Sequence, residues 1–159
     1  MFSIERELCF PGVPKEVLYK GISGWSDNWE ELDYSPVIAG FNAHWTFPFQ
    51  CKFRNVVLDV NGNEYLCHIN GHCIFYASDE GIRVEFSNVN AWHVESKAGW
   101  ITHIGLIPLA DFGYWQGTAR NRKERISVRI KEYLTVWFDS ICGDLLSNLE
   151  TFPMDQVII

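Results

Sequence analysis

Apolar and polar residues alternate along two stretches of the chain, and this period of two predicts β-strands that are half buried. In the first stretch, residues 2–10, Phe2, Ile4, Leu8 and Phe10 share one face. In the second, every odd position is apolar: Val37, Ala39, Phe41, Ala43, Trp45, Phe47 and Phe49. We therefore predict one long strand over 37–49, or two strands joined in register. Its inner face would mix large rings with two alanines.

The middle of the chain predicts further antiparallel strands at 53–60, 64–77, 82–95 and 100–109. Asn61-Gly62 and Asp79-Glu80-Gly81 are typical of the turns between them. In the 82–95 strand the even positions are mostly apolar, but they include Asn88 and Asn90. Either a β-bulge resets the register there, or the inner face carries polar points. The even face would also place Trp92 and Val94 inside, with His93 and Glu95 toward solvent. The 100–109 strand is apolar on both faces, which predicts a central or covered position.

Two regions show helical spacing. Residues 14–33 predict two short helices broken near Gly21 to Gly24. Near the end of the chain, Asn121 and Glu124 resemble a capping box, and Pro153 would end the helix that follows. Its wide apolar face comprises Ile126, Ile130, Tyr133, Leu134, Trp137, Ile141, Leu145 and Leu149.

The order of elements predicts an α+β fold in which a curved antiparallel sheet wraps around a long C-terminal helix. This order, with the segment Val13 to Tyr19 followed by Trp25 and Trp29, resembles the helix-grip fold of the START-like and birch-pollen-allergen-like superfamily. Within this superfamily, the resemblance implies either the Hsp90-activator-like branch or the polyketide-cyclase-like branch. The resemblance implies a cavity between sheet and helix but carries over no catalytic residue.

Composition narrows the class of protein. The chain has 159 residues, with no repeat or linker, which predicts a single domain over 1–159. A net charge of −7 disfavours binding to nucleic acid through bulk charge. Glu5, Arg6 and Glu7 stand where a signal peptide needs apolar residues, and no run is apolar enough for a membrane span. Five cysteines without repeated spacing predict buried thiols in a cytoplasmic protein.

Aromatic residues are abundant: seven Trp, six Tyr and eleven Phe. Those expected on inward faces predict a site for a hydrophobic or aromatic small molecule, or a lipid, between the sheet and the last helix. The same rings could instead fill a packed core. The candidate ligand-binding residues of this kind are Phe41, Trp45, Phe47, Phe86, Trp92, Tyr133 and Trp137.

Two polar residues complete the candidate site. Arg6 falls on the apolar face of its strand, so it must be paired, lie at a sheet edge, or hold an anionic group at a cavity mouth. His103 is either a core histidine or a polar contact inside the cavity. If the protein were a cyclase, dehydratase or isomerase, its acid or base would come from His103, Tyr133 or Arg6. No nucleotide-binding or triad motif is present, and we expect no cofactor.

Two other motifs give weaker signals. The segment from Cys67 to Cys73 contains two cysteines and two histidines. On one continuous strand the cysteines and the histidines occupy opposite faces, and with a tight turn at Asn70-Gly71 each face would hold one cysteine and one histidine. We therefore expect no metal site there. A cluster of six basic residues against two acidic ones lies between Arg120 and Glu132. It is either solvated surface or, as in a protein–protein adaptor, a docking patch built on Arg122, Arg125 and Arg129.

Overall fold

The computed structural model describes residues 2–39, 44–60, 62–97, 100–107, 109 and 122–150, apart from the side chains of residues 39, 95–97, 100–104, 122, 123 and 150. The described elements follow one another in this order: β1 (Ile4–Cys9), α1 (Lys15–Ser26), β2 (Leu32–Tyr34), the 3-10 helix η1 (Pro36–Ala39), β3 (Thr46–Val60), β4 (Asn63–Ser78), β5 (Gly81–Lys97), β6 (Trp100–Ile107) and α2 (Arg122–Glu150).

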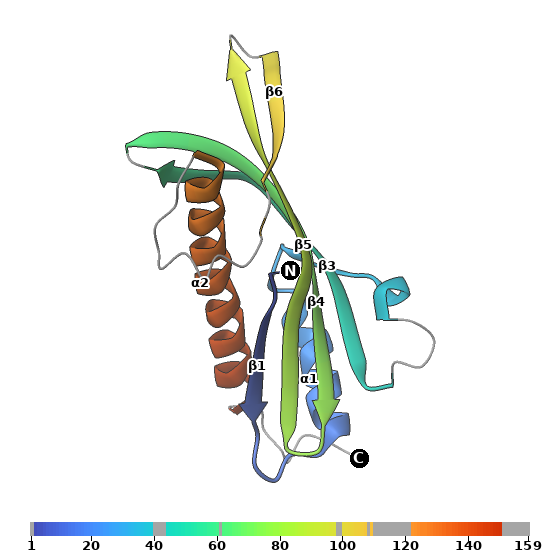
Figure 1. The fold of residues 1–159 in the computed structure, drawn as a ribbon. Helices are drawn as coiled ribbons and strands as arrows, with labels where there is room; N and C mark the ends of the chain where they lie inside the picture. The colour runs from blue at the N-terminus through green and yellow to red at the C-terminus, as the bar shows by residue number, and fades with distance from the viewer. Residues whose placement is uncertain are drawn as a thin grey trace.

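The described strands form one antiparallel sheet in the order β1-β5-β4-β3-β2, with β6 added beside β5. β1 pairs with the first part of β5, at residues 81–86, and β6 pairs with its second part, at residues 91–97. Both strands therefore share one edge of β5, and the β5–β6 ribbon extends beyond the rest of the sheet (Figure 1). β6 pairs with β5 alone among the described strands, so a central position for the 100–109 strand is excluded.

Two β-bulges change which residues of a strand face the core. Asn55 of β3 and Asn88 of β5 lie in the left-handed region, with φ of 58° and 54°, and the strand register shifts at both places. In β3 the buried positions are odd from Phe49 to Phe53 and even from Val56 onward. In β5 they change from even positions before Asn88 to Val89, Ala91 and His93 after it, and Val94, as predicted, is buried as well. The bulge alternative for the 82–95 strand is thus confirmed.

The bulge in β5 overturns one prediction. Because it adds one residue to the strand, His93 turns to the inner face and is fully buried. The expectation that His93 faces solvent is wrong. Trp92, expected inside, lies on the opposite face and is half-buried.

Both helices cover the inner face of the sheet. Trp25 of α1 packs against Phe75 of β4, and Phe138 of α2 packs against Phe86 of β5. The far ends of β3 and β4 bend over the first turns of α2 (Figure 1), where the Arg129 guanidinium donates to the Asp59 carbonyl at 3.1 Å. The predicted α+β fold, a curved antiparallel sheet with a long C-terminal helix, is confirmed. None of the described helices is long and apolar enough to cross a membrane.

Two predictions of local structure are wrong. Pro36 starts the 3-10 helix η1 instead of a strand, and Trp45, with φ of 57°, turns the chain into β3 at Thr46. Residues 15–26 form one helix and not two. Gly21 does not break α1; it lies inside the helix, at a point where the helix packs closely against the Leu149 side chain. The predicted cap Asn121 lies outside the described residues.

Candidate functional site

A cleft of about 400 Å³ opens at the edge of the sheet, between β3, α2 and the segment that leads into β2. Eight residues line it: Glu30, Glu31, Lys52, Phe53, Arg54, Asn55, Val56 and Tyr133. Its volume falls within the roughly 300–1,000 Å³ typical of small-molecule sites. The cleft joins the two layers of the fold, because Phe53 comes from the sheet and Tyr133 from the C-terminal helix.

The cleft begins where β2 ends. β2 pairs with β3 only at residues 49–51, and among the described strands none covers that edge of β3 beyond Cys51. The β3 bulge lies in this uncovered stretch. There the backbone N–H of Asn55 donates to Nδ1 of His68 at 3.4 Å instead of completing the regular ladder. A short β2 and a bulged β3 thus leave room for the cleft.

The apolar wall of the cleft is the half-buried ring of Tyr133, backed by rings of the core, of which Phe53 is only 4% exposed. The rings of Phe53 and Tyr133 meet edge to face with 6.1 Å between their centroids. Behind Phe53, the ring of Trp137 lies at 4.7 Å and that of Phe86 at 6.3 Å. The indole N–H of Trp137 is buried and has no hydrogen-bond partner among the residues that the structure describes. A buried donor without a partner is rare and costs about 1–3 kcal/mol.

Four charged residues line the same cleft, two of each sign: Glu30, Glu31, Lys52 and Arg54. None of them forms an ion pair with another described residue. Glu31 is half-buried. Partial burial and the nearby Glu31 carboxylate raise the pKa of Tyr133 above its ordinary value, because both disfavour a phenolate. The electrostatic effect of Glu31 therefore reaches the aromatic part of the cleft.

A second cleft, of about 380 Å³, lies between β1 and the β4–β5 turn. Its cation, Arg83, is already balanced. The guanidinium contacts Glu85 at 3.1 Å and Glu5 at 3.5 Å, and it lies 4.0 Å from the centroid of the Tyr76 ring. The charges of the first cleft have no such partners in the described ranges, which makes the first cleft the stronger candidate for a ligand.

The structure separates the ring residues predicted from the sequence into three groups. Phe86, Tyr133 and Trp137 gather around Phe53, beside the cleft. Trp45 and Phe47 lie at the start of β3, away from the cleft, and both rings contact Tyr19 of α1. Trp92 lies on the outer face of the sheet, while Phe41 and the side chain of His103 fall outside the described residues.

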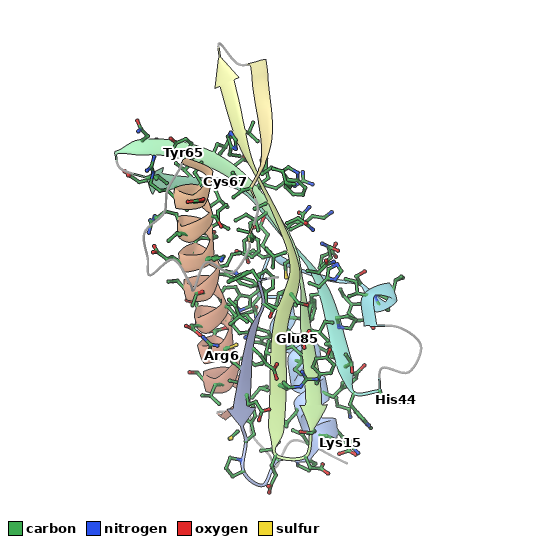
Figure 2. The ribbon with its side chains drawn as sticks, viewed as in Figure 1. Arg6, Lys15, His44, Tyr65, Cys67 and Glu85 are labelled. Atoms are coloured by element: carbon green, nitrogen blue, oxygen red, sulfur yellow. The ribbon has the colours of Figure 1, made fainter. Side chains whose placement is uncertain are left out.

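Arg6 does not approach the cleft. It lies on the edge strand β1, beside α2 (Figure 2), and its Nε donates to Asp139 Oδ1 at 3.0 Å. Both side chains are about half exposed. The paired, sheet-edge alternative for Arg6 is therefore confirmed. Arg6 and Tyr133 contact different neighbours and do not meet in one site.

The remaining motifs also resolve into separate environments. On β4, Cys67 and Cys73 are buried on the inner face, whereas His68 and His72 lie on the outer face. Within the described part of the chain, no group of three potential ligands could hold a metal ion. In the basic cluster, Arg129 is engaged by Glu132 and the Asp59 carbonyl, and the side chain of Arg122 is not among those described.

Sequence reasoning missed Glu30, Glu31, Lys52 and Arg54. They come from a turn and from a bulged strand about 20 residues apart, and no motif connects them. The bulge is the feature that could have drawn attention to them, because bulges are over-represented next to functional sites.

Comparison with known proteins supports the fold. No family model and no curated protein matches the chain. Two solved structures are similar to it. A TBP-like protein from Parabacteroides distasonis matches with a TM-score of 0.63 and 10% identity, over 94% of this chain and 92% of that one. A DUF4468 family protein from Bacteroides ovatus matches with a TM-score of 0.61 and 12% identity, over 95% of this chain and 89% of that one. At this identity the likeness shows the shared sheet-and-helix architecture and nothing of ligand or activity.

Proposed function

We propose that this protein binds a small molecule with a planar apolar ring in the cleft between β3 and α2. The observation that carries the proposal is the meeting of Phe53 and Tyr133, from the two layers of the fold, in a cleft also lined by four charged residues that form no ion pair with the described part of the chain. Small-molecule sites combine apolar walls with a few polar groups that orient the ligand, and this cleft has both.

The proposal keeps one part of the START-like resemblance, a ligand held between the sheet and the C-terminal helix, and alters another. The described rings in the centre of the interface pack against one another. The Trp137 ring contacts Phe53 and Phe86, and the Phe86 ring also contacts Phe138. The ligand would therefore enter at the edge of the sheet, with Phe86 and Trp137 behind Phe53. A charged rim favours an amphipathic ligand over a purely hydrophobic one.

The test uses small aromatic probes and follows binding by NMR. We expect at least one of L-phenylalanine, phenethylamine, 3-phenylpropionate and indole to bind with a Kd below about 1 mM. The indole N–H resonance of Trp137, assigned with a Trp137→Phe variant, would shift on binding because that ring contacts Phe53. Absence of binding by every probe would overturn the proposal.

A pair of variants locates the site. Tyr133→Leu removes the ring on α2 but keeps an apolar side chain, and we expect it to weaken binding about tenfold or more. Tyr34→Leu is the matched control, because Tyr34 is 53% exposed and packs against Phe47 and Phe49, away from the cleft. Equal binding by the two variants would show that the probe binds elsewhere.

A further inference from the structure

We infer that the ligand of this cleft is a zwitterion, specifically an α-amino acid with an aromatic or large apolar side chain. The inference rests on the proposed function and names the ligand class for the same site. Glu30 and Glu31 would hold the ammonium group, and the ring of Tyr133, backed by the buried Phe53, would hold the side chain. Lys52 and Arg54, whose side chains alternate with that of Phe53 along β3, would reach the carboxylate around the uncovered edge of the strand.

The balance of charge in the cleft points to this class. Two carboxylates and two cations line one space, so the site has no net formal charge. A ligand that is only an anion would gain from Lys52 and Arg54 but would be repelled by Glu31, and a ligand that is only a cation would meet the reverse. A zwitterion can pair with the carboxylates and with the cations, and repulsion between like charges in a binding site is a strong source of discrimination between ligands.

Among the described residues the four charged side chains have no ion-pair partner; Glu30, Lys52 and Arg54 are exposed to solvent, and Glu31 is half-buried. Oppositely charged side chains that share a cleft of this size could pair with each other, as Arg83 pairs with Glu85 and Glu5 on the other side of the sheet. Here no nitrogen of Lys52 or Arg54 lies within 4.0 Å of a carboxylate oxygen of Glu30 or Glu31. Glu31 is half-buried and already close enough to act on Tyr133, so it stands beside the ring that would hold the side chain of the amino acid.

The uncovered edge of β3 adds to the argument. Lys52 and Arg54 flank Phe53 in the sequence, and the register shift of β3 falls between Phe53 and Val56. The cleft therefore brings cationic, aromatic and amide-bearing residues together on one short stretch of strand. An α-amino acid, which carries two charges next to one apolar side chain, requires this combination within a small space.

The experiment compares three probes that share one ring and differ only in charge: L-phenylalanine, phenethylamine and 3-phenylpropionate, by titration calorimetry on the full chain. A second set of L-tryptophan, tryptamine and indole-3-propionate covers a larger ring. We expect one of the two amino acids to bind at least tenfold more tightly than both its amine and its acid. Equal affinities within each set would overturn the zwitterion and leave the proposed function standing. No binding in either set would overturn both.

Charge-neutralising variants assign the roles. Glu31→Gln should weaken binding of the amino acid about tenfold and leave 3-phenylpropionate unchanged or tighter. Arg54→Gln should weaken the amino acid and 3-phenylpropionate together and spare the amine. Glu64→Gln, an exposed carboxylate on β4 outside the cleft, is the matched control and should change none of them. If Glu31→Gln weakened all three probes of a set equally, the proposed role of Glu31 would be wrong.

Discussion

His93 of β5 lies directly opposite Gly105 of β6, and the imidazole ring packs onto the glycine backbone. A Cβ atom at position 105 would lie 2.7 Å from Nδ1 of His93 and closer still to Cε1. Gly105 therefore provides the space in which the histidine ring is fully buried. The arrangement depends on the bulge at Asn88, since without it His93 would face the other side of the sheet.

Gly105→Ala should destabilise the protein by about 1–3 kcal/mol, because a buried ring must move to admit the methyl group. The measurement is urea unfolding followed by circular dichroism. Gly143→Ala is the control: that glycine lies inside α2 with open space around its Cβ position, so alanine should stabilise by up to about 1 kcal/mol through helix propensity. A Gly105→Ala variant as stable as the parent would show that the His93 ring can move aside without loss of stability.

Asp144 of α2 connects the two helices, because its Oδ2 accepts the indole N–H of Trp25 at 2.8 Å and that of Trp29 at 3.0 Å. Asp144→Ala should cost about 1–3 kcal/mol, since two partly buried donors lose a charged acceptor, and Asp144→Asn should cost less. The readouts are the denaturation midpoint and tryptophan emission. As a control, Asp139→Ala breaks the exposed pair with Arg6 and should cost at most about 1 kcal/mol. Equal losses at the two positions would contradict this ranking.

The sequence predicted well those features that depend on repeated patterns. The period of two in residues 2–10 and the three- and four-residue spacing in α2 each correspond to an element of the structure, β1 and α2, so that tertiary context did not override them. Features that depend on a single residue were missed or assigned wrongly. One bulge residue, Asn88, turns Val89, Ala91 and His93 to the inner face of β5. Trp45, inside the alternating run from Val37 to Phe49, has a left-handed backbone instead of the predicted strand conformation.

The candidate site was only partly predictable. Tyr133, Phe86 and Trp137 were identified because an apolar pattern places them on inward faces, and they do lie beside the cleft. The charged residues could not be identified in the same way. Glu31 and Arg54 come together only because β2 is short and β3 is bulged, and neither property has a signature in spacing or composition.

The left-handed backbone at Asn88 gives a direct test of the bulge. Asn88→Val should destabilise by about 1–2 kcal/mol, because a β-branched side chain fits poorly at φ of 54°. Asn88→Gly should be much better tolerated, although it loses the 3.4 Å contact between the Asn88 amide and His72. Asn90→Val, two residues along the same strand and exposed, should be neutral. Similar free energies of unfolding for Asn88→Val and Asn90→Val would argue against a left-handed residue at 88.

Burial divides the five thiols into one accessible group and four protected ones. Cys9 is exposed, while Cys51, Cys67, Cys73 and Cys142 are buried. A thiol-specific disulfide reagent at pH 8 should therefore label one thiol rapidly in the native protein and all five after unfolding. Cys9→Ser should remove the rapid phase. Rapid labelling of a second thiol would show that the sheet–helix interface opens easily.

The same burial makes stability fall at alkaline pH. Burial raises the pKa of Cys67 from 9.0 to about 11 and that of Cys142 to about 12, because a thiolate is poorly solvated in the core. Above pH 9 the unfolded chain loses these protons while the folded chain keeps them, so their contribution to stability is complete below pH 9 and declines as pH rises through about 11–12. The free energy of unfolding at pH 8 and pH 10 should therefore differ less in Cys67→Ala than in the parent protein. An unchanged difference would mean that Cys67 ionises equally in both states.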